Sequence, residues 1–142
     1  MRILGIDFGE KRIGLAISDP MGMTAQGLPT LENKNKKQVL ADLGDLCKER
    51  EVNEVVIGLP RNMDGSFGPK AKQVQELLPE LEKTLQVPVL AWDERLTSRE
   101  AGRLMIEQGL SRKRQREGSD RIAATLILQN YLEFKRIKRG ES

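Results

Sequence analysis

Three acidic residues lie at positions from which their carboxylates could meet in the folded chain. Asp7 ends an apolar run near the N-terminus, Glu94 follows a second apolar run, and Asp120 stands at the start of a helical pattern. Burying a carboxylate is costly unless the group is paired, hydrogen-bonded or bound to a metal ion. Each acid also has a structural interpretation: a turn cap for Asp7, a surface ion pair for Glu94, and a helix-dipole contact for Asp120. Taken together, the three acids favour a site for a cation.

The chemistry that suits such a cluster is that of a hard divalent cation. Mg²⁺ and Mn²⁺ take oxygen ligands and retain several waters, so a few carboxylates suffice to hold them. Two such ions roughly 3.5–4 Å apart can activate a water and stabilise the leaving oxygen of a phosphodiester. Asp7, Glu94 and Asp120 are therefore predicted to be metal ligands and catalytic residues of a metal-dependent nuclease, a hydrolase acting on ester bonds.

The acidic pair at residues 93 and 94 leaves an ambiguity. Neighbouring residues of a strand point to opposite faces, so only one of Asp93 and Glu94 should face the site. Arg95 could pair with the other carboxylate or hold a phosphate through two hydrogen bonds. We therefore interpret Asp93 and Arg95 as supporting residues, and the sequence leaves open which acid is the main ligand.

The composition restricts the chemistry further. The chain of 142 residues contains no histidine and a single cysteine, Cys47. These counts exclude Ser-His-Asp and Cys-His catalysis, and zinc sites built from histidines or several thiolates. Cys47 lies among helical apolar positions, which indicates a core residue in a reducing compartment. No apolar run approaches the roughly 20 residues of a membrane span, so we expect a soluble protein with no membrane partner.

The apolar patterns predict five strands and four helices that could position the acids. The expected strands are Arg2–Asp7, Arg12–Ser18, Ala25–Leu31, Glu54–Leu59 and Val87–Trp92, and the expected helices are Lys36–Arg50, Pro69–Leu85, Thr97–Gln108 and Ser119–Arg136. A short turn makes the first two strands an antiparallel hairpin, whereas the nearly all-apolar fourth strand is typical of a buried parallel strand. The pattern predicts one α/β domain over residues 1–142, with a mixed five-stranded sheet flanked by helices.

Three local expectations accompany this reading. Pro79 should kink or split its helix, because proline cannot donate the backbone hydrogen bond that a helix interior needs. Residues Arg112–Glu117 are interpreted as a basic connection that precedes the last helix. Alternation in the first strand places Asp7 on the face of Ile3, opposite Leu4 and Ile6.

Four segments resemble the YqgF family, also called RuvX, whose members are relatives of the Holliday-junction resolvase RuvC. They are GIDFGEKRIGLAISD at 5–19, VIGLPRNMDGSFG at 56–68, DERLTSREA at 93–101 and SDRIAATLILQNYLE at 119–133. The resemblance implies a ribonuclease H-like fold, with three antiparallel strands followed by parallel βα units. It also implies a bacterial cytoplasmic nuclease that matures the 5′ end of the 16S rRNA precursor, with a pre-ribosomal particle as a further partner. The acids of the family fall on Asp7, Glu94 and Asp120.

The positive charge is concentrated in the C-terminal part of the chain. The net charge is +3, and residues 99–142 contain 11 Lys and Arg against 6 Asp and Glu. This asymmetry indicates either a polyanionic partner or a solvated helical face. Candidate contacts with nucleic-acid phosphates are Lys70, Lys72, Arg99, Arg112, Lys113, Arg114 and Arg116.

Three other functions remain open at this point. A Holliday-junction resolvase would use the same acids on four-way DNA and would act as a homodimer, whereas an RNA-processing enzyme could be a monomer. A non-catalytic nucleic-acid-binding module would use the same basic region, but it would gain nothing from three clustered acids. An actin-like or sugar-kinase-like ATPase also begins with a strand and an Asp-x-Gly turn, but it needs two lobes around its nucleotide and this chain has room for one.

Overall fold

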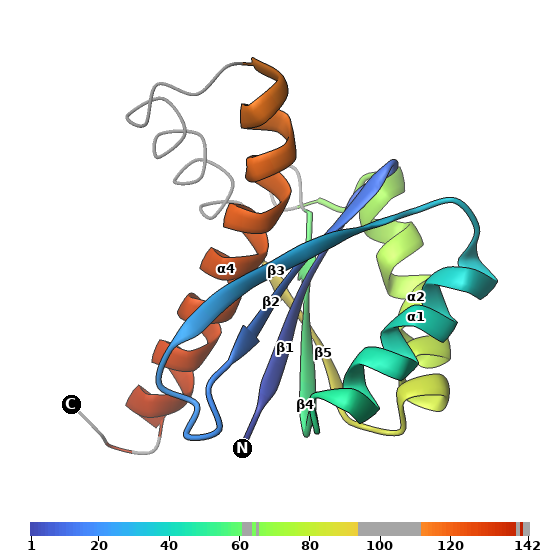
Figure 1. The fold of residues 1–142 in the computed structure, drawn as a ribbon. Helices are drawn as coiled ribbons and strands as arrows, with labels where there is room; N and C mark the ends of the chain where they lie inside the picture. Colours follow the sequence, from blue (N-terminus) through green and yellow to red (C-terminus); the bar gives the residue numbers. More distant parts are fainter. Residues whose placement is uncertain (61–63, 65, 94–111, 139, 141–142) are drawn as a thin grey trace.

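The computed structural model describes residues 1–60, 64, 66–93, 112–138 and 140, and for residues 112–121 it describes the backbone alone. The strands are β1 (Ile3–Phe8), β2 (Arg12–Ser18), β3 (Ala25–Glu32), β4 (Glu54–Leu59) and β5 (Val89–Asp93). The helices are α1 (Lys36–Glu49), α2 (Pro69–Leu85) and α4 (Arg112–Lys138) (Figure 1). The predicted helix Thr97–Gln108 lies outside the described residues.

The five strands form one sheet in the order β3-β2-β1-β4-β5. β1 pairs antiparallel with β2 and β2 antiparallel with β3, whereas β1, β4 and β5 run parallel. This arrangement confirms the predicted mixed sheet. Because β1, β4 and β5 are parallel, their carboxyl ends share one edge, which also holds the N-terminal ends of α2 and α4 (Figure 1).

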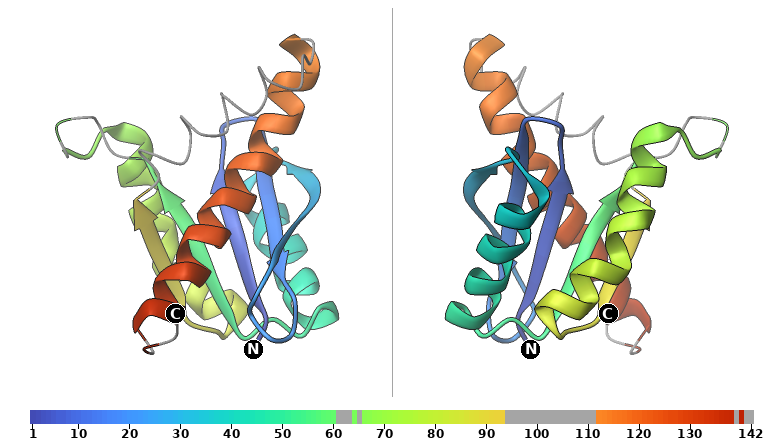
Figure 2. Two further views of the ribbon diagram at one scale, coloured as in Figure 1. Left: turned by 90° about the vertical axis from the view of Figure 1, so that its left-hand side faces the viewer. Right: turned by 90° about the vertical axis from the view of Figure 1, so that its right-hand side faces the viewer.

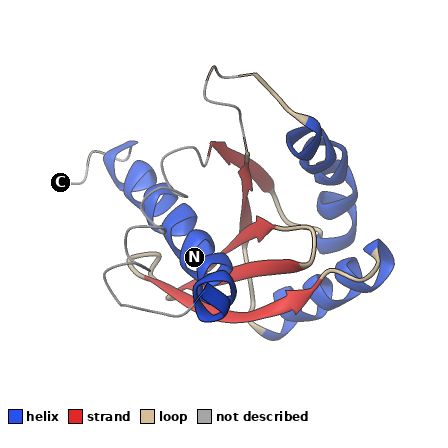
Figure 3. Ribbon diagram, turned by 90° about the horizontal axis from the view of Figure 1, so that it is seen from above, coloured by secondary structure: helices blue, strands red, loops and turns tan. Residues whose placement is uncertain are grey.

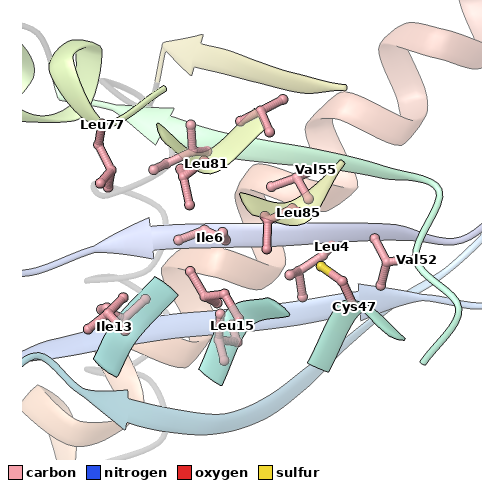
Figure 4. Packing of buried hydrophobic residues seen from close by; sticks show 14 of the residues in the cluster. Leu4, Ile6, Ile13, Leu15, Cys47, Val52, Val55, Leu77, Leu81 and Leu85 are labelled. Carbon is pink, nitrogen blue, oxygen red and sulfur yellow. The ribbon is translucent and has the colours of Figure 1, made fainter. Parts of the chain in front are cut away.

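Helices cover both faces of the sheet. α4 lies across one face, and α1 and α2 lie side by side on the other (Figures 2 and 3). The larger core cluster lies between the sheet and the α1–α2 pair, where Leu4 and Ile6 of β1 meet Cys47 of α1 and Leu81 of α2 (Figure 4). None of the helices in the described part of the chain has the length and apolar character needed to cross a membrane.

The alternation predicted for β1 is confirmed by the two core clusters. Leu4 and Ile6 belong to the α1–α2 cluster, whereas Ile3 packs in the smaller cluster beneath α4 with Ala124 and Leu128. Successive residues of a strand alternate between faces. Residue 7 therefore lies on the face of Ile3, as the sequence pattern predicts, and α4 covers this face.

The expected basic connection at Arg112–Glu117 is wrong, because α4 already begins at Arg112 and extends to Lys138. Arginine, lysine, glutamine and glutamate are all good helix formers. A single interior glycine, here Gly118, costs about 1 kcal/mol, which a helix packed across four strands can tolerate. The local charge pattern was therefore a poor indicator of a loop.

The structure also differs from the sequence-based expectation at Pro79 of α2 and at the start of β5. α2 is not split at Pro79, because the proline lies on the exposed side, where the carbonyl of Gln75 can turn to water while Leu77 and Leu81 stay buried. β5 begins at Val89 and not at Val87. Pro88 has no N–H to donate to a ladder, although its carbonyl accepts a hydrogen bond of 2.9 Å from Val55 N–H.

The reactivity of the Cys47 thiol can be measured to test the packing of α1 against the sheet. Burial raises the pKa of its thiol from 9.0 to about 11, so at pH 8 only about 0.1 % of the side chain is thiolate, the reactive form. We expect no labelling of the native protein by a disulfide reagent at pH 8 within minutes, and one thiol labelled at once in guanidinium chloride. Equally fast labelling in both conditions would show that Cys47 is exposed.

Candidate active site

Asp7 lies at the carboxyl edge of the sheet. It is the penultimate residue of β1, it pairs with Gly14 of β2, and its side chain is partly buried. The neighbouring residue on the same face, Gly5, explains how α4 comes close to this strand. A Cβ atom at Gly5 would lie 3.0 Å from Leu128 Cβ and 3.1 Å from Ala124 O. Glycine therefore allows α4 to pack almost directly on the backbone beside Asp7.

The α4 backbone extends past Gly5 toward Asp7. The first turns of α4 extend beyond the edge where β1 ends, and the helix runs back across the sheet in the direction opposite to β1 (Figure 1). Two strand residues from Gly5 to Asp7 span roughly 6.6 Å, and one helical turn rises about 5.4 Å. The turn that precedes Ala124, which contains residue 120, is therefore at the level of Asp7.

The register of the parallel strands places Asp93 relative to Asp7. Ile6 pairs with Ile57, and Ile57 pairs with Ala91, so the row of Asp7 continues through Gly58 to Trp92. Trp92 packs against the α4 cluster, as the face of Asp7 requires. Asp93, the next residue, pairs with Leu59 and belongs to the opposite face. Asp7 and Asp93 therefore share the edge of the sheet but not its face.

The remaining predicted site residues fall into two groups. Glu94, Arg95 and Arg99 lie outside the described residues. For a second group the structure places the backbone in the first turns of α4 but does not describe the side chains: Arg112, Lys113, Arg114, Arg116 and Asp120. Within the described residues, no three His, Cys, Asp or Glu side chains come close enough to hold a metal ion. The three-carboxylate cluster stays a prediction.

The turn that follows Asp7 is held by hydrogen bonds that the sequence did not predict. Gly9 N–H donates to Arg12 O at 3.1 Å, and Asn33 donates through Nδ2 to Gly9 O at 2.7 Å and through its backbone to Lys11 O at 2.9 Å. A Cβ at Gly9 would lie 2.4 Å from Arg12 O, so only glycine fits there. Asn33 is distant from the turn in sequence, and no local pattern identifies it.

In the segment between β4 and α2, the carboxylate of Asp64 stabilises the loop. Asp64 Oδ1 accepts hydrogen bonds from the Ser66 backbone at 2.9 Å and the Ser66 hydroxyl at 2.6 Å. These bonds lower the pKa of Asp64, an exposed group. Lys70 and Lys72 follow in the first turn of α2, and both are exposed. Asp64 is thus a loop-forming residue, and the two lysines are available at the same edge.

The sequence matches a known family along most of its length. The family model described as "RuvX: Holliday junction resolvase" matches residues 1–134. A protein of Syntrophomonas wolfei subsp. wolfei named "Putative pre-16S rRNA nuclease" is 53% identical over 133 residues, 94% of each chain. A protein of the same name from Halothermothrix orenii is 44% identical over 140 residues, 99% of this chain and 100% of the other.

Solved structures of two resolvases share the fold. Thermus thermophilus RuvC in complex with a Holliday junction substrate gives a TM-score of 0.55 at 17% identity, over 99% of this chain and 96% of the other. The Holliday junction resolvase of fowlpox virus gives a TM-score of 0.58 at 16% identity, over 94% and 99% of the two chains. At these identities the likeness concerns the fold alone, and it confirms the predicted ribonuclease H-like architecture.

Proposed function

Because this chain belongs to the RuvX family, we propose that it is a metal-dependent nuclease that hydrolyses phosphodiester bonds in the 5′ region of the 16S rRNA precursor. Residues 1–142 form a single nuclease domain. The observation that carries the proposal is the position of Asp7, partly buried at the edge where β1, β4 and β5 end and where α4 packs directly on β1. Ligand sites of α/β sheets lie at this edge.

The alternation of β5 supports Glu94 as the second acid. Trp92 lies on the α4 face with Asp7, and Asp93 belongs to the opposite face. A chain that continues extended for one residue beyond β5 returns residue 94 to the α4 face. Glu94 is thus the main ligand from this segment, and Asp93 is a supporting residue.

Asp120 completes the carboxylate set. The close packing of Ala124 and Leu128 on Gly5 supports a position of residue 120, one turn before Ala124, near Asp7. The oxygen donors of three carboxylates suit Mg²⁺ or Mn²⁺, and the chain offers no histidine and only one cysteine, which is buried. Asp7, Glu94 and Asp120 would hold two such ions, which supply an activated water and stabilise negative charge on the leaving oxygen.

Basic residues near the same edge would position the nucleic acid. The first turns of α4, which extend beyond the carboxyl edge of the sheet, contain Arg112, Lys113, Arg114 and Arg116 (Figure 1). Arg95 and Arg99 follow β5 in the chain. Their charges would bind phosphates of either RNA or DNA without reading the sequence. A pre-ribosomal particle in the cytoplasm would supply the specificity.

A Holliday-junction resolvase is the second candidate function. It is favoured by the family description and by the fold shared with RuvC and the fowlpox enzyme. Symmetric cutting of a four-way junction requires a two-fold dimer. An RNA-processing enzyme could act as a monomer or a homodimer, so the oligomeric state and the substrate must be tested together.

Removal of the metal is the direct test of this proposal. We expect end-labelled 16S rRNA precursor to be cut in Mg²⁺ or Mn²⁺ and to remain intact in EDTA, with cutting restored when Mn²⁺ is added back in excess. A four-way DNA junction is treated in parallel, because paired nicks in opposite strands would indicate the resolvase. The oligomeric state is measured by light scattering on the same sample.

Two results would contradict the proposed nuclease. Equal cutting in EDTA and in Mn²⁺ would exclude a metal-dependent mechanism. Binding of both nucleic acids without cutting of either, with or without pre-ribosomal particles, would identify a non-catalytic binding module. Turnover of ATP in the absence of nucleic acid would instead support the ATPase alternative.

A further inference from the structure

Two adjoining recesses lie beside the turn that follows β1. The smaller, of about 290 Å³, is lined by the turn residues Gly9–Arg12 together with Lys70 of α2. The larger, of about 490 Å³, reaches from Phe8 of β1 to α1 and α2. Both are lined by Gly9, Glu10 and Lys70, so they form one continuous groove.

The smaller recess is positively charged. Its charged residues are Lys11, Arg12, Lys70 and a single acid, Glu10. Arg12 lies on the same face of the sheet as Asp7, because it precedes Gly14 by two positions in β2 and Gly14 pairs with Asp7. The smaller recess therefore offers cationic groups to an anion near the candidate active site.

The larger recess has a different character. Its apolar lining consists of Phe8, Val39 and Leu77. The two amide-bearing residues Asn33 and Gln73 and the acid Glu76 also line it. Lys36 forms an ion pair with Glu80 at 2.5 Å, which offsets its charge. An apolar surface combined with amide and carboxylate groups suits a flat heterocycle with hydrogen-bonding edges.

The walls of the groove are already in place. Asn33 holds the turn through its bonds to Gly9 O and Lys11 O, of 2.7 Å and 2.9 Å. The floor residues Val39 and Leu77 are 2% and 6% exposed and belong to the main core cluster. A ligand would therefore find a formed site and would pay little for its ordering.

We propose that this groove binds one nucleotide of a single-stranded nucleic acid, next to the phosphodiester that is cut. The phosphate lies on Lys11, Arg12 and Lys70 in the smaller recess, and the nucleobase enters the larger recess against Phe8. The inference rests on the proposed nuclease function and extends it, because it assigns the strand a path around the end of β1. A duplex base cannot enter the recess, so the strand must be single-stranded there.

The path of the nucleic-acid strand follows from the opposite orientations of Asp7 and Phe8 at the end of β1. Phe8 is the residue directly after Asp7 and points to the opposite face of the sheet, where the larger recess lies. A strand whose phosphodiester meets Asp7 on the α4 face can therefore cross the edge of the sheet at Gly9. The next nucleotide then reaches the recess between α1 and α2.

The test measures binding in EDTA, where no cutting can interfere. The probe is a fluorescein-labelled single-stranded RNA of about 12 nucleotides from the 5′ precursor region, within the usual range of single-strand site sizes. We expect Gln73→Trp to weaken binding about tenfold, because loss of one base contact costs about 1–3 kcal/mol. Gln75→Trp is the matched control on an exposed, non-lining position of the same helix, and it should bind as wild type.

A second pair of variants tests the proposed contacts with the phosphate. The double variant Lys11→Ala/Lys70→Ala should weaken binding roughly tenfold and lower the slope of log K against log salt by about 1.4. Lys83→Ala, exposed in the last turn of α2 at the other end of that helix, should leave both unchanged. Circular dichroism confirms the fold of each variant.

Two outcomes would overturn the subsite. Wild-type affinity in both Gln73→Trp and the double lysine variant would show that the strand does not use the groove. Binding of AMP at micromolar concentration without displacement of the RNA would show that the recess takes free nucleotides and not the strand. Failure of the nuclease proposal is recognised separately, because the protein would then bind the probe with the expected variant pattern but would not cut it in Mn²⁺.

Discussion

Replacement of Asp7 by asparagine or of Glu94 by glutamine is expected to lower turnover on the order of 10³-fold, whereas Asp93→Asn should keep turnover within about tenfold of wild type. Each change removes one negative charge and keeps the size of the side chain. Loss of the charge of a metal ligand has a large effect on turnover, because a neutral amide holds a divalent cation poorly. Asp93 belongs to the other face of the sheet and should matter less.

The measurement is single-turnover cleavage of the substrate that wild type cuts, at saturating Mn²⁺, with thermal unfolding to verify the fold. The Mn²⁺ concentration needed for half-maximal activity should rise in Asp7→Asn and stay constant in Asp93→Asn. The reverse pattern, with Asp93→Asn inactive and Glu94→Gln active, would show that the chain turns directly after β5. In that case the alternation would not extend to residue 94.

The faces of the sheet could be predicted from sequence because strand alternation is a local property. The alternation of Ile3 with Leu4 and Ile6 was sufficient to place Asp7 on the face of Ile3, and the structure shows that α4 covers this face. The choice between Asp93 and Glu94 could not be made in this way. It depends on which face Trp92 takes, and that is known only from the pairing of β5 with β4 and the packing of Trp92 against α4.

Other features depended on contacts between distant segments. The importance of Gly5 comes from Leu128 and Ala124, more than a hundred residues away, and nothing in the strand pattern indicates it. The hydrogen bonds of Asn33 to the turn after β1 are similarly non-local. The start of α4, in contrast, depends on local residue types. The charged run Arg112–Glu117 was interpreted as a loop, although its residue types favour a helix.

Glu54 is the clearest example of a residue whose environment the sequence conceals. It opens β4 and is only 5% exposed. Lys135 Nζ of α4 lies 2.7 Å from Glu54 Oε2, and the Tyr131 hydroxyl donates to Glu54 Oε1. Burial and the neighbouring Glu54 raise the pKa of Tyr131, so the hydroxyl keeps its proton and remains a donor. This buried network joins the C-terminal half of α4 to β4.

Replacement of Lys135 by methionine is therefore expected to lower the free energy of unfolding by about 3 kcal/mol. The loss of the ammonium leaves the Glu54 carboxylate buried with one partner fewer, and the cost of an uncompensated charge exceeds the gain from replacing the ammonium-bearing side chain by a fully apolar one. The partial exposure of Lys135, 27% of its side chain, places the expected cost at the lower end of the range for buried pairs. Lys138→Met is the control, since Lys138 is exposed in the same last turn and should change stability by less than about 0.5 kcal/mol.

Urea unfolding followed by circular dichroism measures both variants, and a triple variant separates the charge from the packing. Glu54→Met/Tyr131→Phe/Lys135→Met removes every polar member of the network, so it should recover most of the stability that Lys135→Met loses. Asp7 lies at the carboxyl edge of the sheet, whereas Glu54 begins β4 at the opposite edge. Cleavage by the folded Lys135→Met protein should therefore equal that of wild type. A stability equal to wild type in Lys135→Met would show that the Tyr131 hydroxyl and water alone satisfy the carboxylate, and that the ion pair contributes nothing to holding α4 on the sheet.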